Sequence, residues 1–150
     1  MVLYRQATAT DIPALLALLR EIMEHHGVQP PEATRLAATV SAILDQPDHL
    51  FLVADDNGQV VGMCALIFSH STWSASPVCE LQDLIVTRVR RRLHVGRGLM
   101  AAAEKLARAR GCTRLFLLAE PWNLEAHAFY RSLGLLEKTC LYFERDLTLE

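Results

Sequence analysis

The sequence predicts a mixed α/β fold, an α+β arrangement with elements in the order β-αα-βββ-α-β-α-β. Three observations lead to this class. Apolar residues recur at helical spacing in four segments, short apolar and β-branched runs separate those segments, and Gly, Pro or Asx residues mark the boundaries. Strands and helices do not alternate one for one, so the pattern is not that of a parallel βαβ array.

The first part of the chain is expected to form an edge strand and two amphipathic helices. Val2–Arg5 is a short apolar run suited to an edge strand. Thr10 is the expected N-cap of the first helix, which carries Pro13 in its first turn and ends at Gly27. The apolar positions that define the two helices are Leu15, Leu18, Leu19 and Ile22, and, between Pro30 and Pro47, Leu36, Val40, Ile43 and Leu44.

A hairpin and a further strand are expected next. Leu50–Ala54 and Val60–Phe68 are apolar runs joined by Asp55-Asp56-Asn57-Gly58, a strong signal for a tight turn. Ser69–Pro77, which contains Trp73, is expected to be a polar loop, and Cys79–Val86 to be a strand.

Two helices and two strands complete the expected order. Gly96–Arg110 is an amphipathic helix with Gly111 at its C-terminal end. The sequence then predicts a strand over Arg114–Ala119, a helix over Asn123–Leu133, and a closing strand over Leu141–Leu147.

Length and composition bound the protein class. With 150 residues, 51% hydrophobic and 21% charged, the chain is expected to form a single domain, residues 1–150. Its net charge of −2 excludes a general field for polyanions. There is no signal peptide and no apolar run near the ~20 residues of a membrane span, so we expect a cytoplasmic protein without a membrane partner. The cysteines are widely spaced and are expected to be reduced thiols: Cys64, Cys79, Cys112 and Cys140.

A local basic cluster lies between an expected strand and an expected helix. Residues 88–97 contain five arginines in ten positions. A helix N-terminus offers unpaired N–H groups and the positive end of the dipole, and Gly96 and Gly98 let a ligand approach the backbone closely. Such a loop is suited to a phosphate or pyrophosphate. The alternative is a solvated basic loop.

Other interpretations of this cluster fit less well. Gly96-x-Gly98-x-x-Ala101 matches a dinucleotide-binding fingerprint, with Glu120 as the ribose-binding acid. However, about nine residues follow Val86 before the glycines, and too few residues follow Glu120 for the second half of that fold. No aromatic residue interrupts the arginine run, so we expect no nucleic-acid partner. The histidines have no spacing that fits a metal site.

Three motifs occur in order along the chain. Arg5-x-Ala7-x-x-x-Asp11 opens it, Arg91-Arg92-Leu93-His94-Val95-Gly96 follows the fourth expected strand, and Asn123-x-x-Ala126-x-x-Phe129-Tyr130-x-x-x-Gly134-Leu135 covers the last helix. Together they resemble the GNAT superfamily of acetyl-CoA-dependent N-acetyltransferases, whose acyl-CoA signature is Q/R-x-x-G-x-G/A. The resemblance covers Tyr4 to Leu147 and implies the GNAT fold, a central mixed and mostly antiparallel sheet flanked by helices.

The resemblance also implies ligands and binding residues. It implies acetyl-CoA as the acyl donor, an amine as the acceptor, no metal, and a possible homodimer. His94 stands where the signature has its first glycine, and a positive φ at that position would strain a histidine. The implied cofactor-binding residues are Leu84, Ile85, Val86, Arg91, Arg92, Leu93, His94, Val95, Gly96, Arg97, Gly98, Asn123 and Tyr130.

Three residues are candidates for catalysis. An amine acceptor must lose a proton, and the resemblance places the accepting carboxylate on the fourth strand, as Glu80 or its rival Asp83. Alternation puts Glu80, Leu84 and Val86 on one face and Asp83 on the other, unless a bulge intervenes. Because Leu84 and Val86 are expected to line the CoA groove, Glu80 is the favoured candidate. Tyr130 is the implied acid for the departing thiolate. Direct transfer requires no cysteine nucleophile.

The acceptor and the activity itself stay open at this point. A small amine or polyamine-like acceptor and a protein or peptide amine are both compatible with the sequence. The alternative function is a non-catalytic acyl-CoA-binding regulatory module of the same fold, which His94 in place of glycine would favour.

Overall fold

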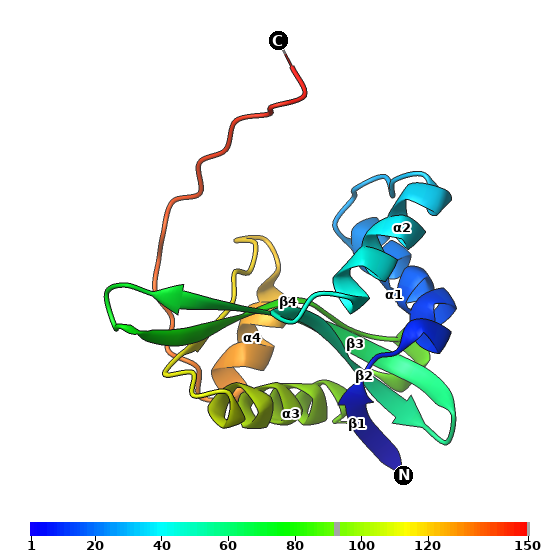
Figure 1. The fold of residues 1–150 in the computed structure, drawn as a ribbon, viewed down its shortest axis with the longest axis horizontal. Coiled ribbons are helices and arrows are strands. Elements are labelled where there is room, and N and C mark those ends of the chain that lie inside the picture. The colour runs from blue at the N-terminus through cyan, green and yellow to red at the C-terminus, as the bar shows by residue number, and fades with distance from the viewer. Residues whose placement is uncertain (92–93, 150) are drawn as a thin grey trace. The chain divides into compact units, whose positions relative to one another are not determined.

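A computed structural model describes residues 1–91 and 94–149, and the chain divides into two compact units. The first unit, Met1–Leu118, contains the sheet and the helices α1, α2 and α3 (Figure 1). The second unit, Ala119–Glu150, contains α4. The mixed α/β class and the five-stranded mixed sheet confirm the expected fold class.

The sheet has the strand order β1-β2-β3-β4-β5. Neighbouring strands from β1 to β4 are antiparallel, and β5 is parallel to β4. This order follows from short connections, because a hairpin joins β2 to β3 and another joins β3 to β4. The strands are β1 (Val2–Gln6), β2 (His49–Asp56), β3 (Gln59–Ser71), β4 (Ser76–Val86) and β5 (Leu115–Phe116).

Helices cover both faces of this sheet (Figure 1). α1 (Ile12–His25) and α2 (Ala33–Leu44) lie on one face, and α3 (Val95–Ala109) lies on the other. Helices cover both faces of β2 and β3, so both faces of these strands are apolar. Because side chains alternate between the two faces along a strand, each of these strands is a continuous hydrophobic run in the sequence. The core beneath α1 and α2 contains Leu15, Leu18, Leu19, Leu36, Val40, Phe51, Val53, Met63, Ala65 and Ile85.

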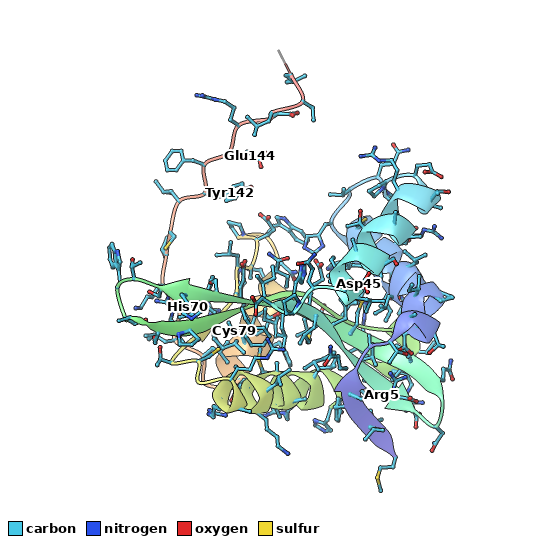
Figure 2. All side chains as sticks on the ribbon, in the orientation of Figure 1. Arg5, Asp45, His70, Cys79, Tyr142 and Glu144 are labelled. Atoms are coloured by element: carbon cyan, nitrogen blue, oxygen red, sulfur yellow. The ribbon has the colours of Figure 1, made fainter. Side chains whose placement is uncertain are left out.

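An arginine on β1 fixes the start of α1 (Figure 2). Arg5 donates through both terminal nitrogens to the two carboxylate oxygens of Asp11, at 2.8 and 2.9 Å, and through Nε to Asp55 at 3.0 Å. Asp11 is buried, and Arg5 lowers the pKa of its carboxyl. Asp11 occupies the N-cap position, so the expectation that Thr10 caps the helix is wrong. A short 3-10 turn over Ala9–Asp11 precedes α1, and within it the Asp11 carboxylate accepts a hydrogen bond from the Thr8 amide at 2.8 Å, so Thr10 lies inside this turn and not at the start of α1.

The two hairpins differ in how well the sequence predicts them. The expected turn between β2 and β3 is confirmed, since Asn57 and Gly58 have φ of 54° and 92°. The expected loop over Ser69–Pro77 is wrong at both ends, because β3 continues to Ser71, which pairs with Ser76 of β4. Polar side chains on an exposed hairpin leave the backbone ladder intact, so composition alone suggested a longer loop.

The end of the first unit and the second unit follow the expected order except for the last strand. β5 is shorter than the expected Arg114–Ala119. α4 (Leu124–Ser132) forms as expected, with Asn123 as its N-cap. The expected closing strand over Leu141–Leu147 is wrong, since residues 135–149 contain no strand. A strand requires a hydrogen-bonded neighbour, and none of the described residues pairs with this segment.

Replacing Arg5 with Met is expected to destabilise the protein by about 2–3 kcal/mol, because the buried Asp11 carboxylate would lose its counter-ion and two hydrogen bonds. Urea unfolding at pH 7 measures the change. Arg35→Met on the exposed surface of α2 is the matched control and should change stability by less than about 0.5 kcal/mol. Equal losses for the two variants would contradict the assigned role of Arg5.

Candidate active site

A bulge interrupts β4 in the middle of the sheet. Gln82 pairs with Ala65 and Ile85 pairs with Met63, so Asp83 and Leu84 together face the single residue Cys64. Asp83 has a φ of 54°, in the left-handed region that most side chains avoid. A bulge of this kind adds one residue to a strand and re-aims the side chains that follow it.

The bulge changes which residues share a face. Glu80 pairs with Ile67, whereas Val86 pairs with Gly62, and these two partners lie on opposite faces of β3. The expectation that Glu80 and Val86 share a face is therefore wrong, because the inserted residue reverses the alternation. Ile85 instead points into the core beneath α1 and α2, together with Met63. The face that carries Glu80 is thus the face covered by α1 and α2.

The Asp83 carboxyl is influenced by titratable groups from two other elements. Its side chain reaches solvent, but surrounding protein removes part of its hydration and raises the pKa of the carboxyl. His49 at the start of β2 and His26 at the end of α1 are close enough to oppose this shift electrostatically. Asp83 is therefore turned toward the α1 side of the sheet, the same side as Glu80.

Glu80 has a more ordinary environment. Its side chain is half-buried, and its Oε1 accepts a hydrogen bond from Nε2 of Gln82 at 3.2 Å. Glu80 is also the last residue of β4 that pairs with β5, opposite Phe116. Beyond it, the outer edge of β4 has no strand partner in the described part of the chain. Both carboxylates thus lie where β4 separates from β5.

The N-terminus of α3 offers unsatisfied donors. His94 is the N-cap with φ of 62° and ψ of 12°, so the position that carries glycine in the GNAT signature does have a positive φ here. The first helical hydrogen bond runs from the Gly98 amide to the His94 carbonyl at 3.0 Å. The amides of Val95 and Gly96 have no acceptor among the described residues, and the first turn has no acidic side chain.

The arginines before and within this helix fall into two groups. Arg90 forms an ion pair with Asp56, and Arg91 donates to Glu21 of α1 at 3.2 Å and to the Val86 carbonyl at 3.1 Å. These two side chains hold the segment in place. Two other guanidinium groups are exposed and have no ion-pair partner within residues 1–91 and 94–149, namely those of Arg88 and Arg97. Arg92 and Leu93 lie outside the described residues.

Three other expected cofactor-binding residues, Val95, Ile85 and Gly98, have no side chain that is available to a ligand. Val95 is 2% exposed and Ile85 is 5% exposed, so their side chains belong to the core. A Cβ on Gly98 would lie 2.0 Å from the ring of Tyr4 on β1, so this glycine makes room for an aromatic side chain. Leu84 and Val86 remain half-exposed on β4.

The remaining two expected residues belong to the second unit. The Oδ1 atom of Asn123 accepts from the Ala126 amide at 3.3 Å and so caps α4. The Tyr130 ring packs edge-on against Phe129, with centroids 5.2 Å apart. The structure thus brings together Glu80 and Asp83 in the first unit, and Asn123 and Tyr130 on one helix in the second.

The cysteines and histidines are further candidate functional residues, and their burial and position bear on that role. Burial raises the pKa of Cys64 and of Cys79, which is labelled in Figure 2, to about 12, so neither holds a thiolate at neutral pH. Residues 1–91 and 94–149 contain no group of three or more His, Cys, Asp or Glu side chains suited to a metal ion. Sequence reasoning considered His26 and His49 only as metal ligands and missed their electrostatic influence on the pKa of the Asp83 carboxyl. The pairing of His49 with Ile67, which in turn pairs with Glu80, places His49 and Glu80 on one face of the sheet.

Known proteins are similar to this chain in sequence and in fold. The sequence model of the acetyltransferase (GNAT) family matches residues 13–135. The chain is 29% identical over 135 residues to the uncharacterized N-acetyltransferase YhfO of Bacillus subtilis (strain 168), with 90% of each chain covered. It is 31% identical over 130 residues to the aminoalkylphosphonate N-acetyltransferase of Salmonella typhimurium, covering 87% of this chain and 82% of that one.

A solved structure shows the same fold. The aminoglycoside acetyltransferase meta-AAC0020, from an uncultured soil metagenomic sample, superposes with a TM-score of 0.82 at 21% identity, covering 97% of this chain and 96% of that one. Fold and family match together define an acyltransferase enzyme. More narrowly, the chain belongs to the GNAT family of acetyltransferases, which use acetyl-CoA and an amine acceptor. None of the helices in the described part of the chain has the length and apolar character needed to cross a bilayer.

His94→Gly is expected to be more stable than His94→Ala by about 1 kcal/mol, because only glycine adopts the observed positive φ without strain. Both variants remove the imidazole, so the comparison isolates the backbone term. Denaturant unfolding of the two proteins measures it. Equal midpoints would mean that residue 94 does not keep the left-handed conformation in solution.

Proposed function

We propose that this chain transfers the acetyl group of acetyl-CoA directly to a primary amine. The proposal is supported by one juxtaposition in the first unit. β4 carries two carboxylates where it separates from β5, and the segment that follows leads into a helix N-terminus with unsatisfied amides and exposed arginines. The first feature can accept a proton and the second suits a pyrophosphate. Bound acetyl-CoA supplies the acyl thioester.

The residues near α3 fit an anionic cofactor. The free amides of Val95 and Gly96 would donate to phosphate oxygens, and Arg88 and Arg97 would add charge. Arg91 would act indirectly, because its hydrogen bonds to the Glu21 side chain and to the Val86 carbonyl fix the connection between β4 and α3. The side chains of Leu84 and Val86 would contact the apolar part of the cofactor, and the backbone around Ile85 would take part in binding.

The two carboxylates on β4 would assist the deprotonation of the amine acceptor. At pH 7 an amine with a pKa near 10.4 must lose its proton at a cost of about 4.6 kcal/mol before it can attack. Asp83 is our choice for the proton acceptor, since partial dehydration raises the pKa of its carboxyl and makes it a stronger base. Glu80, held by Gln82, is the second carboxylate on the same face and would bind the ammonium form.

Two residues of the second unit have roles that the family resemblance implies. By resemblance to the family, the Tyr130 hydroxyl would protonate the departing thiolate and Asn123 would contact the pantetheine chain. In this chain Phe129 orients the Tyr130 ring, and Asn123 also caps the same helix. Neither role requires a metal or a cysteine nucleophile.

The acceptor class follows from the charge of the site. Asp83 and Glu80 on one face would favour a cationic small amine or polyamine-like molecule over a neutral one. One relative is named an aminoalkylphosphonate N-acetyltransferase, so an aminoalkylphosphonate is one of the acceptors to test. A protein or peptide amine is the second acceptor class. Binding of acetyl-CoA without turnover would identify a regulatory module instead.

Asp83→Asn is expected to lower kcat/KM about 100-fold with the best acceptor, because the variant loses the base. Thiol release from acetyl-CoA is measured across a panel of polyamines, aminoglycosides, aminoalkylphosphonates, amino acids and peptide amines. Glu80→Gln should raise KM for the amine more than it lowers kcat, and Tyr130→Phe should lower kcat. Glu104→Gln on the outer surface of α3 is the control with full activity. Full activity of Asp83→Asn would overturn its assignment.

The double variant Arg88→Ala and Arg97→Ala is expected to raise KM for acetyl-CoA about tenfold without changing kcat. The loss should shrink in high salt, because exposed charges are screened. Arg108→Ala, an exposed arginine in the last turn of α3, is the matched control. Unchanged acetyl-CoA affinity in the double variant would place the pyrophosphate elsewhere.

A further inference from the structure

A row of paired residues crosses four strands beneath the first turn of α3. Tyr4 of β1 pairs with Ala54 of β2, and Ala54 pairs with Gly62 of β3. Gly62 in turn pairs with Val86, the last residue of β4. Side chains of directly paired residues leave the same face of a sheet, so this row lies on the face covered by α3 (Figure 1). The two smallest residues form the middle of the row, which lets the helix lie close to the sheet.

The row contacts α3 at Gly98 and Leu99. A Cβ on Gly62 would lie 3.2 Å from Cδ1 of Leu99. A Cβ on Gly98 would lie 2.0 Å from both Cζ and the hydroxyl oxygen of Tyr4, and 2.6 Å from Cε2. Because atoms that are not bonded do not approach this closely, an alanine at position 98 and the Tyr4 ring cannot keep their present places together. Gly98 has no positive φ, so its contact with Tyr4, and not its backbone conformation, is what requires glycine.

Gly98 also closes the first turn of α3. Its amide donates to the carbonyl of His94, the N-cap, at 3.0 Å. The amides of Val95 and Gly96, which the proposed function assigns to phosphate oxygens, lie inside this turn. Because the turn is closed by that hydrogen bond, a shift of Gly98 relative to the sheet moves both donors.

We propose that Tyr4 is a positioning residue for the cofactor, because its ring against Gly98 sets the height of the first turn of α3 above the sheet. This inference rests on the proposed binding of acetyl-CoA at that turn. Tyr4 lies on β1, three strands away from the carboxylates of β4, so its effect falls on donor binding and not on proton transfer. Arg91 fixes the segment before the helix, whereas Tyr4 fixes the helix itself.

The first test is Gly98→Ala, which breaks the contact without changing a charge. The KM for acetyl-CoA, and the Kd of CoA measured by calorimetry, should each rise about tenfold with kcat unchanged, which is the affinity that one well-placed hydrogen bond contributes. Gly111→Ala at the C-terminal end of α3 is the matched control, since Gly111 has a φ of 79° and no atom near its Cβ position. It strains the same helix but should leave CoA affinity unchanged. Equal losses in the two variants would overturn the proposal.

The second test asks whether the two residues act through each other. Tyr4→Leu removes the ring atoms that meet position 98, so it should weaken CoA binding while making room for the alanine of Gly98→Ala. The losses in the double variant should therefore be smaller than the product of the two single losses. Tyr4→Phe keeps the ring and should bind CoA as the wild type does. Multiplicative losses, or a loss in Tyr4→Phe equal to that in Tyr4→Leu, would contradict the role of the ring.

A donor without the pyrophosphate separates this role from the proposed function. S-acetyl-pantetheine lacks that group, so its kcat/KM should be equal in Gly98→Ala and the wild type, and a loss equal to that with acetyl-CoA would overturn the inference. Acetylation with unchanged CoA affinity in Gly98→Ala would overturn the role of Tyr4 and leave the proposed transfer intact. Weakened CoA binding in Gly98→Ala, with no amine acetylated by the wild type, would support the role of Tyr4 and overturn the transfer. A wild type that binds no CoA would overturn both.

Discussion

The position of the site depends on the register between β3 and β4. β3 is buried on both faces, so its side chains fix which residues of β4 meet each layer of the core. One extra residue opposite Cys64 lets the first half of β4 present Glu80 beneath α1 and α2 while the second half presents Val86 toward α3. At the bulge, where the alternation of side chains reverses, Asp83 is not paired with a residue of β3. A single insertion thus places acid–base groups and the strand end that leads to α3 on opposite sides of one sheet.

The arginines before α3 and in its first turn differ in whether they form ion pairs within the protein or are exposed to solvent. The net charge of −2 hides a segment with five arginines, yet the described members of this segment do not all face a ligand. Arg90 and Arg91 are bound to Asp56 and Glu21, and Arg91 also holds the carbonyl at the end of β4. Such pairs contribute little to stability when exposed, but they fix the direction of a loop. Among the arginines of this segment that the structure describes, this leaves Arg88 and Arg97 exposed and open to an anion.

Local signals predicted the helices and the first hairpin because each depends on nearby residues. Asn57-Gly58 needs only its own dihedral preferences, and α1 to α4 follow from apolar spacing with Pro or Gly at the ends. The bulge was beyond such reasoning, since alternation along β4 cannot reveal how many residues face Cys64. Local signals also could not show that His49 and Glu80 share a face, because this follows from the pairing of both residues with Ile67. The closing strand failed because an alternating apolar pattern describes a strand only when a partner exists.

Backbone strain is concentrated at the two ends of the segment that joins the carboxylates to the helix. Four non-glycine residues have a positive φ, among those described; Asn57 and Ala75 lie in hairpin turns, while Asp83 and His94 lie at the bulge and at the N-cap of α3. Each such residue costs on the order of 1–2 kcal/mol and persists only where its surroundings hold it. Here the surroundings are the ladder between β3 and β4 on one side and the Arg91 bonds to α1 and β4 on the other. Aspartate and histidine enter the left-handed region more readily than most residues, so the bulge and the N-cap of α3 can hold these two side chains, and at the bulge the result is an exposed carboxylate on β4.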